Sequence, residues 1–432
     1  MAGPAELTRR VFLQGTTTGL AAASMTTCLS TSAAPTPSER VVVGLIGAGD
    51  FGRRQHLNRL LLPNPRVEIG AVCDVNEIHR EMAARDIHRQ RGKRVAIYKD
   101  FRELLDRSDI DAVVIVTPDH WHAVIAVAAM EAGKDVYCEK PLTHTIDEGK
   151  TMVATARRYA TVFQTGSQQR SDNYYFRKAY DLVRAGRIGK LRKVTTHLGP
   201  SSPGTWQQPQ TPPAYLDWDF WLGPAPYVDY TPNRCNYHFR WYSDYSGGKL
   251  TDHGAHQNDI AQWIIGADGS GPTRIEGKGN FHEDGPHDVL RDFEVKFTYG
   301  RHGGIELFCT SQRSEFDAGF NLYGDGGRIS VSRLRIFASD PDIVNTDSQN
   351  FDDRFLESYA RHYENWLDCI RSRERPVCDV EIGHRSVTVC HLANLAVRLG
   401  RPLSWNPDRE TFVDDPAADR LLSRPLRSPW RV

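Results

Sequence analysis

The chain has 432 residues, which exceeds what one hydrophobic core usually organises, so two domains are expected. Its 54 basic residues balance 54 acidic residues, and this neutrality argues against nucleic acid or another polyanion as a partner. After residue 40, no stretch is long and apolar enough to span a bilayer. Composition therefore predicts a globular protein of two domains without a membrane span.

Residues 1–38 are predicted to be a leader and linker. Thr8-Arg9-Arg10-Val11-Phe12-Leu13 precedes a modestly apolar stretch rich in Gly, Ala and Thr, and a tail of small residues follows. This pattern is typical of a twin-arginine export signal cleaved near Ala33; the alternative is a disordered tail with two chance arginines. Cys28 follows a poor match to a lipobox, which argues against a lipid anchor. We therefore expect a periplasmic or otherwise exported protein that loses its signal.

Cysteine usage predicts folding in a reducing compartment. Seven cysteines remain after the leader, an odd number without CxxC or metal-ligand spacing. Cys73 and Cys138 lie at the ends of predicted buried strands, where a thiol behaves as a small apolar group. We expect neither a disulfide framework nor a structural zinc.

The stretch Val41–Gly52, VVVGLIGAGDFG, is predicted to be a buried strand that runs into a glycine-rich turn and a helix. Its glycines have the G-x-G-x-x-G spacing, which allows a tight turn, close approach of a pyrophosphate, and close packing of the helix on its strand. Phosphate would lie at the helix N-terminus, where free N–H groups favour negative charge. The residues expected around the pyrophosphate are Gly47, Gly49, Asp50, Phe51 and Gly52.

A second predicted strand, 67–73, ends at Asp74, about 20 residues beyond the glycines. An acidic residue at this place accepts from the ribose 2′-hydroxyl and repels a 2′-phosphate. The three following residues include no arginine that could compensate this repulsion. The sequence therefore predicts that the cofactor is NAD rather than NADP.

Residues 39–165 are predicted to form a Rossmann domain of six parallel strands alternating with helices. The stretch 111–117 is apolar throughout, as a strand covered on both faces should be. It is followed by Thr117, Pro118 and His122, and the next strand delivers Glu139-Lys140-Pro141. Ligands bind at the carboxyl ends of such strands, so these residues are expected beside the cofactor.

Residues 166–432 are predicted to form an α+β domain with a largely antiparallel, open-faced sheet. Alternating strands are expected at 191–197, 274–281, 292–299, 304–310 and 328–331, and helices at 174–185, 355–370 and 383–399. An open sheet face would leave apolar strand residues in water, so we expect a second copy of the chain to cover it.

The insertion 200–248 is long and dense in aromatic residues, including Trp206, Trp218, Trp221, Trp241 and Tyr242. Long loops are usually functional, and flat aromatic faces suit the apolar faces of sugars. The alternative is that these rings pack against their own domain.

Glu139-Lys140-Pro141 and the segment 247–259, GGKLTDHGAHQND, resemble the Gfo/Idh/MocA oxidoreductases. Thr117-Pro118-x-x-x-His122 and the turn Arg-Ala-Gly-x-Ile-Gly at 184–189 are similar too, and the resemblance covers essentially the whole mature chain. It implies hydride transfer between NAD and a sugar, sugar derivative or cyclitol, with Lys140, Asp252 and His256 as the catalytic set. The resemblance further implies a cofactor site of Gly47, Gly49, Asp50, Phe51, Gly52, Asp74, Thr117, Pro118, His122, Glu139 and Lys140, and a substrate site of Lys140, Arg170, Trp241, Tyr242, Asp252, His253 and His256.

The chemistry suits these residue types. Hydride transfer from a secondary alcohol requires removal of the hydroxyl proton, and His256 is the side chain best able to accept it near neutral pH. Lys140 can stabilise the negative charge that develops on the same oxygen, and Asp252 can orient the imidazole if both lie on one helix face. For Lys140 the alternative is a surface lysine. For His253 and His256 it is a metal site with Asp252 and Asp259, which we do not predict because the dinucleotide already accepts the hydride.

Two other functions stay open. One is an NAD-dependent glycoside hydrolase that oxidises a ring carbon transiently and eliminates the aglycone, as in relatives that cleave N-acetylgalactosaminides and carry an export leader. The other is an idle NAD-binding sensor, which the intact Lys140, Asp252 and His256 disfavour.

Overall fold

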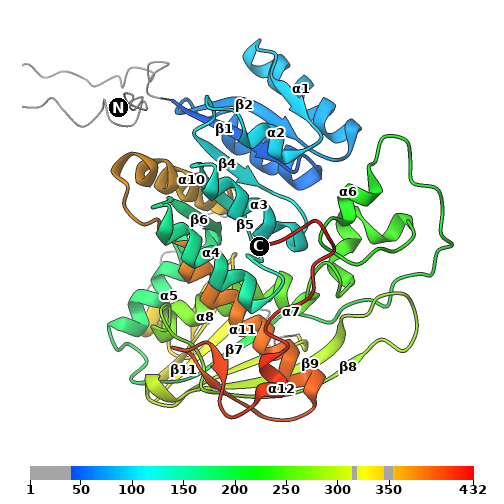
Figure 1. The fold of residues 1–432 in the computed structure, drawn as a ribbon. Coiled ribbons are helices and arrows are strands. Elements are labelled where there is room, and N and C mark those ends of the chain that lie inside the picture. Colours follow the sequence, from blue (N-terminus) through cyan, green and yellow to red (C-terminus); the bar gives the residue numbers. More distant parts are fainter. Residues whose placement is uncertain (1–39, 173, 314–318, 345–353) are drawn as a thin grey trace, which may run out of the picture.

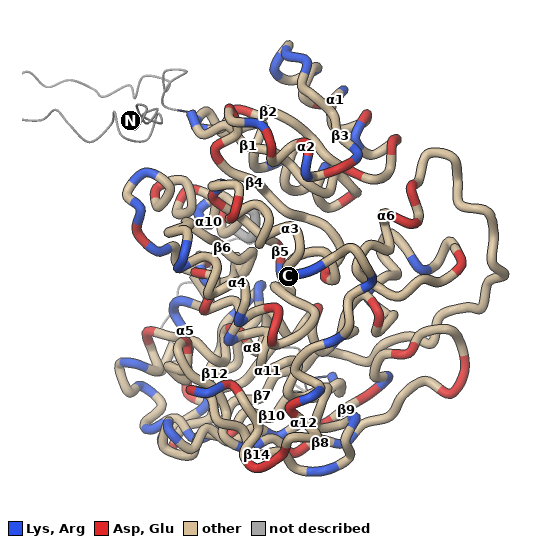
Figure 2. Tube along the Cα trace, in the orientation of Figure 1, with Lys and Arg blue, Asp and Glu red and all other residues tan. Residues whose placement is uncertain are grey.

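The computed structural model describes residues 40–172, 174–313, 319–344 and 354–432 (Figure 1). The predicted twin-arginine leader lies outside these residues. Two sheets organise the described chain, one of six strands and one of nine. Lys and Arg alternate with Asp and Glu over both parts of the trace, without a segregated block of either sign (Figure 2).

The first sheet is parallel and has the order β3-β2-β1-β4-β5-β6, which confirms the predicted Rossmann domain. The strand order reverses between β1 and β4, and ligands of such sheets bind at that reversal. Its elements are β1 (Val41–Ile46), η3 (Phe51–Leu61), β2 (Val67–Cys73), α1 (Glu77–Arg91), β3 (Ala96–Tyr98), α2 (Phe101–Leu105), β4 (Ala112–Ile115), α3 (Asp119–Glu131), β5 (Asp135–Glu139), α4 (Ile146–Arg158) and β6 (Phe163–Gly166).

The helix predicted after the glycine turn begins at Phe51, and it is a π-helix. Near its end the N–H of Leu62 donates to the carbonyl of Leu57, five residues back. Such helices are rare and occur often at functional sites. The periodicity of the sequence predicts that this segment is helical but does not distinguish the winding.

The second sheet has the order β13-β12-β11-β7-β10-β9-β8-β14-β15. Its pairs are antiparallel except for β7 and β10, which run parallel, so the prediction of a largely antiparallel sheet is confirmed. Four short strands, β11, β13, β14 and β15, were not predicted. The elements are η4 (Gln168–Ser171), α5 (Tyr175–Arg184), β7 (Leu191–His197), α6 (Trp218–Leu222), η5 (Pro232–Arg234), η6 (Asn236–Trp241), α7 (Lys249–Asp252), α8 (Gly254–Ile265), β8 (Arg274–Phe281), β9 (Leu290–Tyr299), η7 (Gly300–His302), β10 (Ile305–Thr310), β11 (Phe320–Gly324), β12 (Gly327–Val331), β13 (Ile336–Ala338), α9 (Pro341–Val344), α10 (Arg354–Ser372), α11 (Val380–Leu399), β14 (Leu403–Asn406), β15 (Thr411–Phe412) and α12 (Pro416–Asp419).

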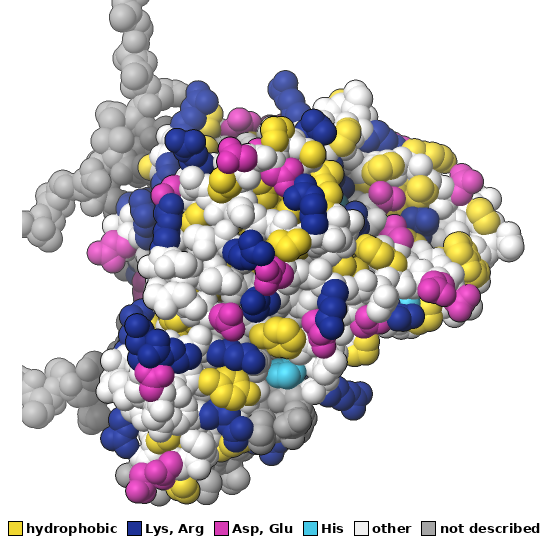
Figure 3. Space-filling view, turned by 90° about the horizontal axis from the view of Figure 1, so that it is seen from below, with side chains coloured by type: hydrophobic (Ala, Val, Ile, Leu, Met, Phe, Trp, Pro, Cys, Tyr) yellow, Lys and Arg dark blue, Asp and Glu magenta, His cyan; other side chains and the backbone are white. Residues whose placement is uncertain are grey.

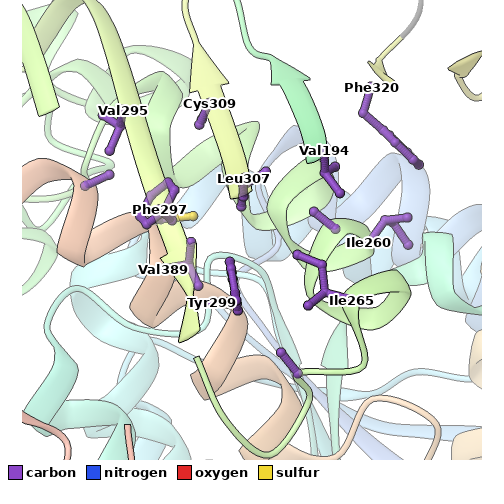
Figure 4. Packing of buried hydrophobic residues seen from close by; sticks show 14 of the residues in the cluster. Val194, Ile260, Ile265, Val295, Phe297, Tyr299, Leu307, Cys309, Phe320 and Val389 are labelled. Atoms are coloured by element: carbon purple, nitrogen blue, oxygen red, sulfur yellow. The ribbon is translucent and has the colours of Figure 1, made fainter. Parts of the chain in front are cut away.

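Helices α8 and α11 cover one face of this sheet. Phe297 and Leu307 on neighbouring strands point toward Ile260 of α8 and Val389 of α11 (Figure 4). All four side chains are almost completely buried. Because α8 is packed on the sheet in this way, the segment that leads from α7 into α8 is held in place, and with it Asp252 and His256.

The opposite face of the sheet is more polar than we predicted. Lys296 lies between Glu276 at 3.2 Å and Glu306 at 3.6 Å on the two flanking strands. Lys193 lies over the rings of Phe308 and Tyr323, at 5.5 and 5.8 Å from their centroids. Basic and acidic side chains are also interspersed over the end of the molecule that carries this sheet (Figure 3). The premise that this face exposes mainly apolar residues is therefore wrong.

Helix α10 comes late in the chain but packs on the Rossmann domain (Figure 1). Tyr363 stacks on Tyr137 of β5 with ring centroids 4.4 Å apart. The Tyr363 hydroxyl lies 2.7 Å from Nδ1 of the buried His56 in η3. Helix α10 thus completes the hydrophobic core on one side of the Rossmann sheet.

The aromatic insertion mainly packs against itself and the Rossmann domain. The carbonyl of Trp221 accepts hydrogen bonds from Trp121 Nε1, at 2.9 Å, and His120 Nε2, at 3.2 Å, on α3. Trp430 in the C-terminal tail packs on Trp121 and stacks on Phe220. The exposed aromatic rings of the insertion are Trp206, Tyr215, Tyr227 and Tyr237. The alternative reading, in which most of these rings build their own domain, is the better one.

The seven cysteines among the described residues are buried and unpaired. Within the same residues, no helix combines the length and apolar character that crossing a bilayer requires.

Candidate active site

At two positions of the glycine turn after β1, there is no room for any side chain. A Cβ on Gly47 would lie 2.4 Å from the carbonyl oxygen of Val116, and Gly47 has φ of +93°. A Cβ on Gly52 would lie 2.0 Å from the carbonyl oxygen of Gly47. At Gly49 the nearest atom would be in His79, 3.8 Å away, so that side of the turn is open. This cradle fits the pyrophosphate of a dinucleotide, with Asp50 and Phe51 at the start of η3 beside it.

Asp74 ends β2 directly beside this turn. Its Oδ2 accepts from the N–H of Ala48 at 2.7 Å, and its Oδ1 accepts from the N–H of Asn76 at 2.8 Å. Burial opposes protonation of His79, but the neighbouring Asp74 outweighs it and raises the pKa of His79. Arg80 donates to the backbone carbonyl of Asp74, so an arginine lies closer than the sequence suggested. Oδ2 also pairs with His79 Nδ1 at 3.6 Å, whereas Oδ1 keeps a lone pair with which to accept from a ribose hydroxyl.

His122 lies between the two loops that follow β4 and β5. Its Nδ1 is 2.8 Å from the carbonyl oxygen of Pro141, and its Nε2 is 2.9 Å from the carbonyl oxygen of Thr117. Both ring nitrogens are thus directed at backbone carbonyls, so His122 helps to position the two loops, and its contact with the cofactor stays a prediction. The buried hydroxyl of Thr117 has no hydrogen-bond partner within the described chain, and Pro118 caps α3 next to it.

Glu139 is buried at the end of β5 and faces protein donors. Its Oε1 accepts from Gln168 Nε2 at 2.7 Å and lies 3.2 Å from His56 Nε2, while its Oε2 accepts from the N–H of Lys140 at 3.1 Å. This carboxylate therefore fixes the turn that presents Lys140, and its direct contact with the cofactor stays a prediction. The Lys140–Pro141 peptide is cis.

Lys140 and Asp252 come together across the two domains. Lys140 Nζ donates to Asp252 Oδ1 at 2.8 Å and to the backbone carbonyl of Asp252 at 3.1 Å. Burial would raise the pKa of Asp252, but the charges of Lys140 and Arg240 hold it well below its usual range. Asp252 is therefore ionised, and it holds the Lys140 ammonium in one place.

His256 follows in the first turn of α8. Asp252 ends the short helix α7, and His253 lies at the junction, so the single helix face expected for Asp252 and His256 is interrupted. His256 is half-buried, and its Nδ1 has no hydrogen-bond partner among the described residues. Burial, together with the positive charges of Lys140 and Arg333, holds the pKa of His256 well below 6.5. The imidazole is neutral at neutral pH and can accept a proton.

The His253 side chain is only partly exposed, and its ring contacts Lys249. Burial of its ring and the charge of Lys249 lower the pKa of His253 to about 4, against the opposing effect of Asp252. Lys249 Nζ lies 3.1 Å from the ring Nε2, which is the geometry of an ammonium donating to a neutral imidazole. In the part of the chain that the structure describes, no three His, Cys, Asp or Glu side chains converge on a possible metal position.

Arg170 was predicted to bind substrate, but its buried guanidinium is occupied elsewhere. Nε donates to both oxygens of Asp259 at 2.8 and 2.9 Å, and Nη2 donates to Asp268 at 2.8 Å. This arrangement joins η4 to α8 and gives Arg170 a structural role. Tyr242 is likewise buried in the core of the insertion, under the guanidinium of Arg234, whereas Trp241 adjoins the site through Lys249, 5.6 Å from its ring centroid.

Sequence reasoning missed three basic residues of this region. Arg240 lies in η6 of the aromatic insertion, Lys249 begins α7, and Arg333 lies between β12 and β13. Arg333 Nε donates to Gln169 Oε1 at 2.8 Å, and Gln169 Nε2 donates to the carbonyl of His256 at 3.3 Å. Lys249 belongs to the motif that carries the family resemblance, but no local signal marks Arg240 or Arg333.

Comparison with known protein families shows to which family the chain belongs. The family profile described as "Oxidoreductase family, NAD-binding Rossmann fold" matches residues 41–167, and the one described as "Oxidoreductase family, C-terminal alpha/beta domain" matches residues 202–432. The chain belongs to the Gfo/Idh/MocA oxidoreductase family. The glycine cradle and this assignment agree, so the first domain of this Gfo/Idh/MocA protein binds NAD and the protein is an NAD-dependent oxidoreductase.

Several known proteins are similar to this chain. It is 26% identical to scyllo-inositol 2-dehydrogenase (NAD(+)) of Bacillus subtilis over 352 residues, 78% of this chain and 88% of that protein. It is 33% identical to alpha-N-acetylgalactosaminidase of Shewanella oneidensis over 207 residues, 42% of this chain and 44% of the relative. The crystal structure of aldose-aldose oxidoreductase from Caulobacter crescentus has the same fold, with a TM-score of 0.61, 18% identity, and coverage of 84% of this chain and 99% of that one.

Proposed function

We propose that this oxidoreductase oxidises a secondary alcohol of a sugar, sugar derivative or cyclitol. The observation that carries the proposal is the Lys140–Asp252 pair with the neutral His256 beside it, at the edge of the NAD-binding sheet. The similarity to an inositol dehydrogenase over most of both chains supports a polyol substrate.

In this proposal each residue has one task, and NAD supplies the hydride acceptor when it is bound. His256 accepts the hydroxyl proton as the carbon–hydrogen bond breaks. Lys140 Nζ donates to the same oxygen and stabilises its developing negative charge. Asp252 holds Lys140 through its side chain and its backbone carbonyl, at 2.8 and 3.1 Å, so that little reorganisation is needed during the reaction.

The alternative is a redox-neutral glycoside hydrolase, favoured by the similarity to an N-acetylgalactosaminidase over part of the chain. Mass spectrometry of products formed from a panel of monosaccharides, cyclitols and aryl glycosides separates the two. An oxidised product that has lost two hydrogen atoms supports the dehydrogenase. A free aglycone without net oxidation supports the hydrolase, and no product from any compound would reject both.

We further propose that the protein is exported with its cofactor as a prosthetic group. The support is the leader-like sequence of residues 1–38, since an exported enzyme has no evident pool of NAD from which to replace a lost cofactor. Asp74 beside the glycine turn favours NAD over NADP.

Denaturing mature protein purified from the periplasm should therefore release NAD in an amount stoichiometric with the chain. Quantifying both dinucleotides by chromatography checks this result. NADP as the main released species would contradict the role of Asp74. A clearly substoichiometric amount, with activity only after NAD is added, would contradict the prosthetic group.

A homo-oligomer is proposed as well. The support is the sheet face opposite α8 and α11, where the half-buried rings of Phe308 and Tyr323 lie beneath Lys193 and give a second copy a mixed aromatic and polar surface to contact. Light scattering at micromolar concentration is expected to give the mass of a dimer or larger assembly, and the mass of a single chain would reject the proposal.

A further inference from the structure

The region around Asp252 carries more positive than negative charge. Four basic side chains, Lys140, Arg240, Lys249 and Arg333, act on Asp252 or on the two histidines that follow it. Among the described residues, Asp252 is the carboxylate that forms ion pairs with this group. The buried carboxyl of Asp119 also interacts with Arg240 and Asp252, although burial raises its pKa. The two histidines do not add charge, because burial lowers both of their pKa values.

Arg240 reaches this region from the aromatic insertion. Its Nε lies 3.5 Å from Asp252 Oδ1, the same oxygen that already accepts from Lys140 at 2.8 Å. The guanidinium lies over the rings of Phe239 and Tyr237, with centroids 4.6 and 4.9 Å away. These rings hold the guanidinium plane in place, and a planar donor of this kind suits a carboxylate or a phosphate.

Lys249 is close enough to Asp252 to feel its charge but forms no direct ion pair with it. Its Nζ lies 3.1 Å from His253 Nε2 and 5.6 Å from the centroid of Trp241, and no ion pair to an acidic residue of the described chain is found. Burial and the charges of Lys140 and Arg240 lower the pKa of Lys249, with Asp252 opposing. A half-buried ammonium surrounded by other cations is stabilised by an anion that binds beside it.

Resting on the proposed function, we propose that the substrate is a carbohydrate bearing an anionic group, which Lys249 and Arg240 bind beside the reacting hydroxyl. Carboxylates of sugar acids and phosphates of sugar phosphates share the required chemistry. The ring of Trp241 is buried beneath Lys249 and helps to hold its ammonium in place. Lys140 keeps its catalytic role, because Asp252 neutralises it independently of the substrate.

The test compares matched sugars on the NAD-loaded enzyme. Glucose, glucuronate and glucose 6-phosphate, and the corresponding galactose series, are assayed by reduction of the bound NAD, with an artificial electron acceptor in excess to reoxidise it so that kcat/KM can be measured. We expect kcat/KM to be about tenfold or more higher for an anionic member than for its neutral partner, as one charge-assisted hydrogen bond provides. Added salt should weaken only the anionic member. Whichever of the two anionic sugars has the higher kcat/KM shows whether the site prefers a carboxylate or a phosphate.

Lys249→Gln should lower the ratio of kcat/KM between the anionic and the neutral sugar by about tenfold. Lys93→Gln is the matched control, since Lys93 forms a surface ion pair with Glu68 in the Rossmann domain and should leave the ratio unchanged. NAD content and thermal stability show whether each variant is folded. If Lys249→Gln does not fold, the comparison of anionic and neutral sugars on the parent protein, with its salt dependence, tests the proposal.

Equal efficiency for neutral and anionic sugars, or an unchanged ratio in Lys249→Gln, would overturn the anionic substrate while leaving the proposed dehydrogenase intact. If no sugar of either charge reduced the bound NAD, the proposed function itself would fail and this inference with it.

Discussion

Replacing Lys140 by methionine is expected to lower kcat by about 10²-fold or more, with NAD still bound. Methionine keeps the length of the side chain but removes the ammonium that stabilises charge on the substrate oxygen. It also leaves the buried Asp252 without its partner at 2.8 Å. Steady-state kinetics and the NAD content of the purified variant check this result.

Lys150 provides the matched control for this substitution. It lies on α4 and forms an ion pair with Asp147 at 2.8 Å. Lys150→Met should leave kcat close to that of the parent protein, because exposed ion pairs contribute little. Unchanged turnover in Lys140→Met would show that the Lys140–Asp252 pair is structural only.

Replacing His256 by asparagine is expected to lower kcat/KM by about 10²-fold or more through loss of the general base. Asparagine retains a polar side chain of similar reach but accepts no proton near neutral pH. NAD binding should survive, because the glycine turn and Asp74 lie on other elements. His302→Asn, on the turn between β9 and β10, is the control and should behave as the parent protein.

The pH dependence gives His256 a signature that a structural residue lacks. Burial and the charges of Lys140 and Arg333 place the pKa of His256 well below 6.5, and only the unprotonated ring can act as base. Activity of the parent protein should therefore be full above that pKa and fall as the pH drops through it, so the acid limb lies well below pH 6.5. Measured profiles of kcat/KM check this. An acid limb at or above pH 6.5, or the same limb in His256→Asn, would contradict the assignment.

The Rossmann domain could be predicted because its signals are local. A fully apolar strand, the glycine spacing and Asp74 each specify their own surroundings, and the structure places Asp74 against the turn as expected. The strands of the second sheet were harder to predict from the sequence. Its strand β11, Phe320–Gly324, is short, and it pairs between β7 and β12, which no local period in the sequence indicates.

In the candidate site too, some residues could be predicted from the sequence and others could not. The motif residues Lys140 and Asp252 meet as the resemblance implied, although they are far apart in the sequence. The partner of a polar side chain is set by folding, and the sequence does not show that Arg170 pairs with Asp259 or that His122 contacts the carbonyl of Thr117. Arg240 was missed because it reaches Asp252 from a loop whose path is set by packing of aromatic rings.

The central claim is that a carbohydrate carbon gives its hydride to NAD held in the first domain. A sugar that the product panel identifies as a substrate, uniformly deuterated on carbon, is mixed with NAD-loaded enzyme under single-turnover conditions, and the dinucleotide is recovered for mass spectrometry. The account predicts reduced NAD that carries one deuterium on the nicotinamide ring. Turnover of the sugar with no deuterium on the dinucleotide at any time would contradict it.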